Sequence, residues 1–197
     1  MPIPQQGGGQ APVAQPGMFN APNQPGMATP NASAANASDQ FQIASIPIPE
    51  FQNLSALRPI TAGIQVGNSR AIANGKTPGS RMQFTYYEPA GSHPRQSLPC
   101  VIVASAGTNL MFGIAEPTPE YDLETRPYVE AGFAVLGISL DGKLADANNS
   151  KLEQLQQAFQ EFRDSGGGLV NVRNGIEFLI RKVPQVDPSR QIGRAHV

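Results

Sequence analysis

The chain has 197 residues, a formal net charge of −1 and one cysteine, and 15% of its residues are charged. This length allows one α/β domain of ordinary size. The near-zero charge, without clusters of Lys or Arg, argues against a nucleic-acid partner. A lone Cys100 excludes an internal disulfide framework and a Cys-rich zinc site. The two histidines, His93 and His196, leave little for metal binding or acid–base chemistry.

The first 40 residues differ in composition from the rest of the chain. Ala, Pro, Gln, Gly and Asn make up 30 of them, and Asp39 is their only charged residue. Such a segment has too little apolar surface to offset the entropy of ordering it. We predict a disordered, low-complexity tail over residues 1–55, which is either a spacer or interaction tail or a linker without a partner. Its start lacks the pattern of a signal peptide, a membrane anchor upstream of Met1 stays open, and no compartment is indicated.

Strand patterns come first after this tail. Residues 81–87 alternate and are rich in aromatic side chains, which predicts a strand leading into a turn at 88–92. Residues 98–104 form a continuous apolar run, as expected for a strand buried on both faces. The stretch 98–115 carries no charge, but Ser, Gly, Thr and Asn interrupt it, so a core strand is favoured over a membrane span.

Helices and strands then alternate. Residues 120–130 are predicted to form a helix that ends at Gly132, and residues 133–140 a second buried strand closed by Asp141 and Gly142. Two amphipathic helices should follow, separated by the glycines at 166–168. The first presents on one face Leu152, Leu155, Phe159 and Phe162, and the second Leu169, Val172, Ile176, Leu179, Ile180 and Val183. Pro184 ends the second helix, residues 186–190 form a turn, and an apolar strand is expected next.

This order of elements indicates an α/β domain with a mostly parallel sheet. The chemistry of such sheets lies beyond the carboxyl ends of the strands. We therefore expect a site near residues 105–112, after one buried strand, and near Asp141 and Gly142, after the next.

Several kinds of chemistry are excluded or disfavoured by the motifs. The chain has neither a G-x-G-x-x-G after a strand nor a G-x-x-x-x-G-K-[ST], so we predict no nucleotide and no other cofactor. The glycines 166–168 follow a helix, which favours a chain reversal over an anion site. Ser139 lies inside an apolar strand and lacks the small neighbours of a nucleophile elbow, so we interpret it as structural. Cys100 is interpreted as a small buried hydrophobe and His93 as solvated surface.

Three segments in chain order carry a resemblance to a known family. They are LPCVIVASAGT at 98–108, YVEAGFAVLGISLD at 128–141, and GIEFL at 175–179 with VDPSR at 186–190. Together they resemble the α/β-hydrolase fold, and within it the dienelactone-hydrolase-like and prolyl-oligopeptidase-like serine hydrolases. The resemblance implies an incomplete α/β-hydrolase domain over residues 56–191, the N-terminal portion of the sheet with flanking helices. In these families a D-P-x-R turn leads into the strand that ends at the nucleophile motif G-x-S-x-G.

The resemblance also implies where the catalytic groups lie. The triad of this fold runs in the order Ser, Asp or Glu, His, and all three would follow the strand that begins near Gln191. Of the catalytic parts only an oxyanion donor would lie in the chain itself, the backbone N–H of Gly107 or Thr108. An ordinary turn at these two residues is the alternative. The implied parent is a serine hydrolase that acts on a small-molecule ester or a peptide bond and is inactive as this chain, with a non-catalytic α/β-hydrolase-like or Rossmann-like binding module as the alternative.

The last six residues could be encoded by a sequencing adapter and not by the natural gene. IGRAHV at 192–197 is what ATC GGA AGA GCA CAC GTC encodes, and that string matches a widely used sequencing-library adapter. We therefore predict that residues 192–197 are adapter read-through, and His196 is not enlisted as a catalytic base. The alternative is that Ile192 and Gly193 open the next strand.

Overall fold

A computed structural model describes residues 42–61, 63–72, 76–104, 119–144 and 150–195. Most of the expected tail, as well as Gly107, Thr108 and His196, lies outside these described residues. The elements are, in chain order, η1 (Ile43–Ser45), β1 (Arg58–Thr61), β2 (Ile64–Arg70), β3 (Gln83–Pro89), β4 (Leu98–Ala104), α2 (Pro119–Glu130), β5 (Ala134–Ile138), α3 (Leu152–Asp164), α4 (Leu169–Lys182) and β6 (Val186–Ala195).

The strands form one six-stranded sheet in the order β1-β2-β3-β5-β4-β6. Strands β5, β4 and β6 are parallel, whereas β1, β2 and β3 pair antiparallel with one another and β3 pairs antiparallel with β5. The sheet is therefore mixed, and the expectation of a mostly parallel sheet was wrong for its first half. For β1 and β2 the reason is their short connection, residues 62–63, because a parallel pair needs a crossover of a dozen or more residues.

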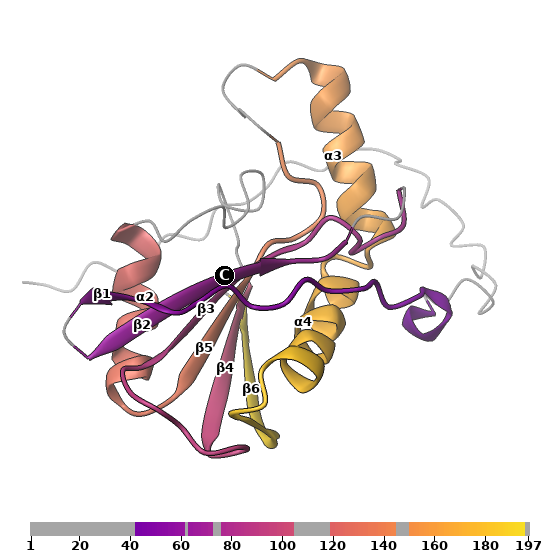
Figure 1. Ribbon diagram of the computed structural model, residues 1–197. Helices are drawn as coiled ribbons and strands as arrows, with labels where there is room; N and C mark the ends of the chain where they lie inside the picture. Colours follow the sequence, from indigo (N-terminus) through magenta and orange to yellow (C-terminus); the bar gives the residue numbers. More distant parts are fainter. Residues whose placement is uncertain (1–41, 62, 73–75, 105–118, 145–149, 196–197) are drawn as a thin grey trace, which may run out of the picture. The chain divides into compact units, whose positions relative to one another are not determined.

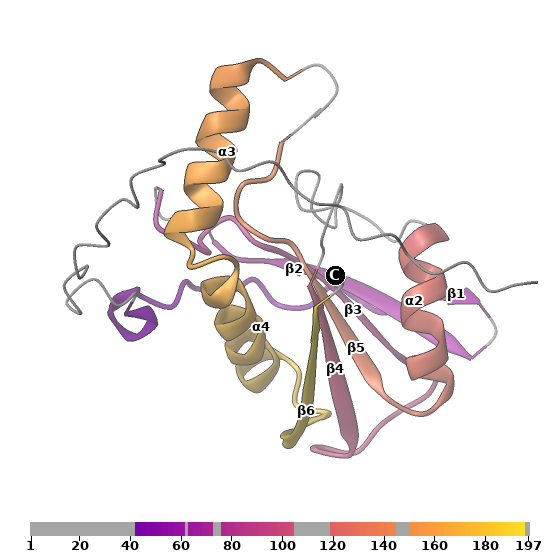
Figure 2. The same ribbon diagram turned by 180° about the vertical axis from the view of Figure 1, so that it is seen from behind.

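The connection from β4 to β5 and the connection from β5 to β6 run in opposite directions across the sheet. Their helices therefore lie on opposite faces of the sheet (Figures 1 and 2). Successive side chains of β4 point to opposite faces of the sheet, and each face has its own hydrophobic core. Cys100 and Ile102 face the core beneath α4, which includes Phe178 and Leu179. Val101 and Val103 face the other core, to which α2 contributes Val129. An α/β arrangement with flanking helices was expected and is confirmed.

Helix α4 packs on the core with most of its predicted face. Leu179 and Val183 are buried, and Val172 and Ile176 pack against the core, whereas Leu169 and Ile180 are each 54% exposed. The buried residues inside the helix are Val170, Asn171, Asn174, Gly175, Phe178 and Leu179. Gly175 allows a close approach to β5, because a Cβ atom there would lie 3.2 Å from Cγ2 of Ile138.

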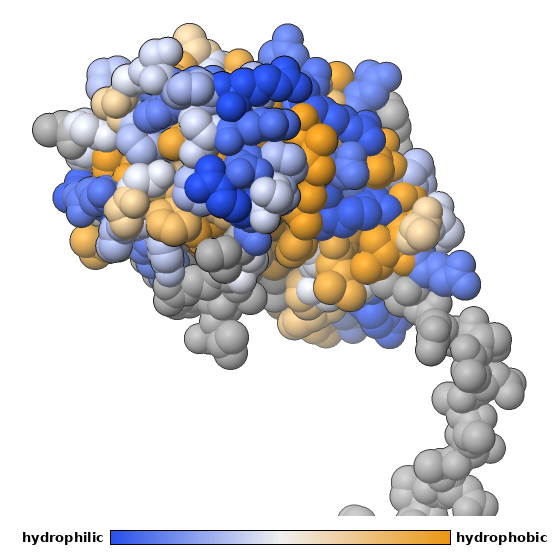
Figure 3. Space-filling model, turned by 90° about the horizontal axis from the view of Figure 1, so that it is seen from below, coloured by the Kyte–Doolittle hydropathy of each residue, from blue (hydrophilic) through white to orange (hydrophobic). Residues whose placement is uncertain are grey.

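Helix α3 forms where expected, but its apolar face is mostly uncovered by the described residues. Leu152 is 68% and Phe159 is 64% exposed, and Ala158 is the buried residue of the helix. Only the end of the predicted stripe reaches the core, where Phe162 packs. Seen from below, the surface likewise mixes hydrophilic side chains with a band of hydrophobic ones (Figure 3).

The folded unit begins earlier than residue 56. Phe51 is 5% exposed, and its ring makes edge contacts with Phe84 at 5.7 Å and with Phe178 at 5.8 Å between centroids. Further upstream, the guanidinium of Arg173 donates to the carbonyl oxygens of Ile43 and Ile46, at 2.6 and 2.8 Å. The segment from residue 43 to 55, which we assigned to the tail, thus packs on α4 and the sheet. Its isolated apolar residues gave no periodic signal from which this could be predicted.

Strand β6 begins at Val186, so residues 186–190 belong to the strand and the expectation of a turn before it was wrong. The register with β4 shifts over these residues, from Leu98 opposite Val186 to Cys100 opposite Gln191. Strand β6 runs to Ala195 and pairs with β4 alone among the described strands. Residues 192–195 thus lie in the strand, and their origin from an adapter stays a prediction about the nucleotide sequence. In the part of the chain that the structure describes, none of the helices has the length and apolar character that crossing a membrane requires.

Candidate site at the carboxyl ends of the parallel strands

The parallel strands end side by side at one edge of the sheet. Ala104, the last residue of β4, pairs with Ile138 at the end of β5 and with Ala195 at the end of β6. The chain passes from β4 to β5 on one side and then returns past β4 to β6 on the other. Such a reversal of direction opens a crevice beyond the carboxyl ends of the strands, which is where α/β proteins bind ligands.

The expected oxyanion segment starts at the centre of this edge. Residues 105–118, with Gly107 and Thr108, follow Ala104 of the middle strand and lie outside the described residues. Residues 139–142 follow the neighbouring strand β5 and are described. Ala104 and Ile138, the strand ends that precede the two segments singled out by the sequence, are therefore paired at this edge.

Ser139 has a structural role at this edge. It is 3% exposed, and its Oγ accepts a 2.8 Å hydrogen bond from the backbone N–H of Gln83. Its own N–H donates to the carbonyl oxygen of Gln83 at 3.0 Å. Ser139 thus extends the pairing of β5 with β3 by one residue, in agreement with its interpretation as structural.

Asp141 ties three parts of the chain together. Its Oδ2 accepts a 2.6 Å hydrogen bond from the N–H of Gly79, in the turn before β3. Its own N–H points to Oδ1 of Asn171 in α4, at 3.4 Å. Burial raises the pKa of the Asp141 carboxyl, and hydrogen bonding from Gly79 opposes that shift. A part-buried carboxylate that accepts from a backbone N–H fixes loop geometry, and an Asp-Gly pair directly after a buried strand is the signal for it in the sequence.

A hollow of about 280 Å³ opens beside Asp141. Among its lining residues are the ionisable Arg81, Asp141, Lys143 and Glu161. Arg81 and Glu161 form an ion pair at 2.9 Å. Lys143 donates from Nζ to Oε1 of Gln83 at 2.9 Å. The roles of Arg81, Lys143 and Glu161 were not predictable from the sequence, because these residues come from three separate parts of the chain and form no motif.

Cys100 and His93 lie away from this edge or inside the core. Cys100 is fully buried in β4, and burial raises the pKa of its thiol to about 12, as expected for an inert core residue. His93 follows β3 and therefore lies at the opposite edge of the sheet. It is half-buried, with Nε2 2.8 Å from the carbonyl oxygen of Pro89, so its interpretation as solvated surface was only partly right.

The glycines between α3 and α4 form a chain reversal, as predicted. Gly166, Gly167 and Gly168 have φ angles of 66°, 65° and 91°, in the left-handed region. The N–H of Gly167 donates to the carbonyl oxygen of Phe162, which caps the end of α3. The described residues contain no group of three metal-ligating side chains.

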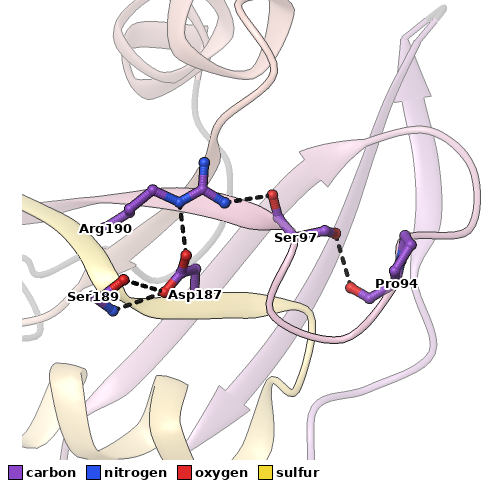
Figure 4. Close-up of polar contacts among 5 residues, drawn as sticks. All are labelled: Pro94, Ser97, Asp187, Ser189 and Arg190. Atoms are coloured by element: carbon purple, nitrogen blue, oxygen red, sulfur yellow. Dashed lines mark hydrogen bonds and ion pairs between the residues drawn. The ribbon is translucent and has the colours of Figure 1, made fainter.

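The VDPSR segment, the sharpest element of the sequence resemblance, is a compact polar cluster at the start of β6 (Figure 4). Oδ1 of Asp187 accepts hydrogen bonds from the N–H and the Oγ of Ser189, at 2.9 and 2.7 Å. Arg190 donates to Oδ2 of Asp187 at 2.7 Å and to the carbonyl oxygen of Ser97 at 2.9 Å. The bonds from Ser189 and then from Arg190 lower the pKa of Asp187 to about 2. The cluster therefore fixes the start of β6 beside the start of β4.

Comparisons with known proteins place the fold. No family model and no curated protein matches the sequence. Among solved structures, a cold-adapted esterase from an Arctic intertidal metagenomic library has a TM-score of 0.52 at 11% identity, over 73% of this chain and 55% of that chain. An acetyl xylan esterase from Paenibacillus sp. R4 has a TM-score of 0.49 at 16% identity, over 78% and 48%. A protein described as a dienelactone hydrolase from Klebsiella pneumoniae has a TM-score of 0.46 at 17% identity, over 67% and 49%.

The chain spans about half the length of these solved structures. At such low identity the likeness establishes the arrangement of strands and helices and nothing of the chemistry. The described part of the chain shares its fold with the cold-adapted esterase, and this is the α/β-hydrolase type of fold that the sequence resemblance implied.

Proposed function

We propose that the chain is the N-terminal part of a serine hydrolase that cleaves a carboxylic ester or a peptide bond. In the complete enzyme a Ser following β6 would attack the carbonyl carbon, a His would take the proton from its hydroxyl, and an Asp or Glu would orient the His. The esterases and hydrolases among the structural neighbours support this class of reaction. The chain itself would contribute the sheet, the two helical layers and one side of the oxyanion site.

The observation that carries the proposal is the place of β4 in the sheet, between β5 and β6, with Cys100 of β4 opposite Gln191 of β6. Because β4 and β6 are neighbouring parallel strands, we expect the segments that follow them to be neighbours at the crevice. A nucleophile on a turn directly after β6 would then lie next to backbone N–H groups at Gly107 or Thr108. Backbone donors held in this way stabilise the negative oxygen of the tetrahedral intermediate.

The first test is the longer reading frame of the parent gene. We expect G-x-S-x-G directly after the strand that begins at Val186, and Asp or Glu and then His further on. We expect the complete protein to hydrolyse p-nitrophenyl butyrate, with inhibition by a serine-directed phosphonate, and the 197-residue chain to show no turnover. A turn without Ser would instead support the non-catalytic binding module, and phosphonate-sensitive turnover by the 197-residue chain would contradict the proposed position of the triad.

The second test concerns the oxyanion donor and uses the complete protein. Thr108→Pro removes the backbone N–H and Thr108→Ala retains it, so the pair separates the donor from the side chain. Where Thr108 is the donor, we expect a loss of about 10²–10³ in kcat for T108P and a change of less than about threefold for T108A. If T108P and the corresponding G107P both keep full kcat, neither residue is the donor and these two positions form an ordinary turn.

A further inference from the structure

A second hollow, of about 390 Å³, lies next to the first. Arg81 lines both hollows. Its position follows from the pairing of Arg70, the last residue of β2, with Gln83, the first residue of β3. Because Gln83 is also bonded to Ser139, this hollow lies at the edge where the parallel strands end. It is lined by Gln52, Arg70, Ala71, Ile72, Arg81, Met82 and Gln83.

The charge of this lining is positive. It contains two guanidinium groups and no carboxylate. Arg81 is paired with Glu161, which lines the neighbouring hollow. The guanidinium of Arg70 takes part in none of the ion pairs formed within the described ranges. Among the described residues, Arg70 therefore has no acidic partner in an ion pair, and Arg81 has one, Glu161.

The amide of Gln83 adds a donor with a defined orientation. Its Oε1 accepts from Nζ of Lys143, so its NH₂ group is turned away from that ammonium. No carboxylate of the described residues lies within ion-pair distance of Lys143, and burial lowers the pKa of this lysine. The positive charge around Gln83 is therefore only partly compensated, which favours an anion beside it.

We propose that this hollow binds a small organic carboxylate. Arg70 and Arg81 bind its oxygens, since the planar guanidinium matches the geometry of a carboxylate. Ala71 and Ile72 follow Arg70 in the chain, Met82 follows Arg81, and all three line the same hollow. Ile72, which is 40% exposed, provides the main apolar contact for the body of the ligand. This apolar part favours an organic anion over inorganic phosphate. The site does not depend on the proposed hydrolase, because none of its residues belongs to the oxyanion segment or to the triad.

The 197-residue chain can be tested directly by isothermal titration calorimetry with three probes. Phenylacetate supplies a carboxylate on an apolar body, phenylacetamide is its neutral analogue, and inorganic phosphate is an anion without an apolar body. We expect phenylacetate to bind at least tenfold more tightly than either of the others, and its affinity to fall as NaCl is added. Equal binding of phenylacetamide, tighter binding of phosphate, or no binding of phenylacetate up to 50 mM would each overturn the proposal.

Matched variants then test the residues. Arg70→Gln should weaken phenylacetate binding about tenfold, whereas Arg58→Gln, at an exposed arginine of β1 outside the hollow, should change it less than twofold. Arg81→Gln should weaken binding to a similar extent. Glu161→Gln breaks the same ion pair but keeps the guanidinium, so it should retain or strengthen binding. If E161Q weakens binding as much as R81Q does, Arg81 acts only through the ion pair and the assignment is wrong.

Discussion

Asp141 and Gly79 are 62 positions apart in the chain and are joined by a hydrogen bond of 2.6 Å from the glycine N–H to the aspartate Oδ2. Gly79 adopts a φ of +74°, and a Cβ atom there would collide with the side-chain amide of Asn174. The turn before β3, the end of β5 and the start of α4 therefore meet at a point where a side chain on residue 79 would not fit. This contact supports the described side of the proposed crevice.

The first prediction follows from the charge of Asp141. Burial raises its pKa in the folded protein, so the folded state binds this proton more tightly than the unfolded state does. Relative to Asp141→Asn, which cannot ionise, the wild-type chain should lose unfolding free energy as the pH rises from about 4 through the folded pKa. Urea unfolding of both proteins between pH 4 and 8 measures this. A difference that stays constant over the whole range would contradict it.

Asp141→Ala tests the hydrogen bond rather than the charge. Alanine leaves the N–H of Gly79 without its acceptor in a part-buried position. We expect a loss of about 1–3 kcal/mol of unfolding free energy, larger than that of Asp141→Asn, which keeps an acceptor oxygen. If both variants lost the same unfolding free energy, the hydrogen bond from Gly79 would contribute nothing to stability.

Asp187 should show the opposite dependence on pH. Its pKa is lowered from 3.8 to about 2 in the folded protein, so the ionised form stabilises the fold above pH 4. That contribution should disappear as the pH falls from 4 to 2, and Asp187→Asn should lack it altogether. The measurement is the urea midpoint of both proteins at pH 2, 3, 4 and 6. Ser189→Gly, which removes one of the hydrogen bonds, should show a smaller change of the same sign.

Strands β3, β4 and β5 were predictable because their signals are local. The buried runs at 98–104 and 133–140 and the glycines at 132 and 166–168 each specify a conformation within a few residues. The antiparallel half of the sheet was not predicted, because β1 and β2 lack a clear alternation of apolar and polar residues. The pairing of these strands also depends on the turns that join them, which must be recognised first.

Contacts between residues that are far apart in the chain could not be predicted from the sequence. The close approach of Gly175 in α4 to Ile138 in β5 is one such contact. In the same way Arg70, Arg81 and Lys143 are scattered charges in the sequence, and the pairing of β2, β3 and β5 gathers them around Gln83. Of the candidate site, the structure shows the paired strand ends Ala104 and Ile138 that precede the two predicted segments, and Gly107 and Thr108 stay predictions.

The next prediction uses two phenylalanines in opposite surroundings. Phe51 is 5% exposed and contacts Phe84 and Phe178, whereas Phe159 on α3 is 64% exposed. Phe51→Ala should cost about 3–5 kcal/mol of unfolding free energy, because it leaves a cavity beneath the segment that precedes β1. Phe159→Ala should change it by less than about 0.5 kcal/mol. Urea unfolding at pH 7 measures both, and equal losses would mean that Phe51 does not belong to the core.

Two glycines with nearly the same φ separate backbone strain from packing. Gly132 has a φ of +88° with nothing near its missing Cβ, and Gly142 has a φ of +87° with the carbonyl group of Ala158 against it. Gly132→Ala should cost about 1–2 kcal/mol, which is the strain of an L-residue in the left-handed region. Gly142→Ala carries the same strain and must also push α3 away from the segment after β5, so it should cost clearly more. Urea unfolding measures both losses, and their difference gives the cost of the clash between the added Cβ atom and α3. A difference of zero would mean that α3 does not contact Gly142 in solution.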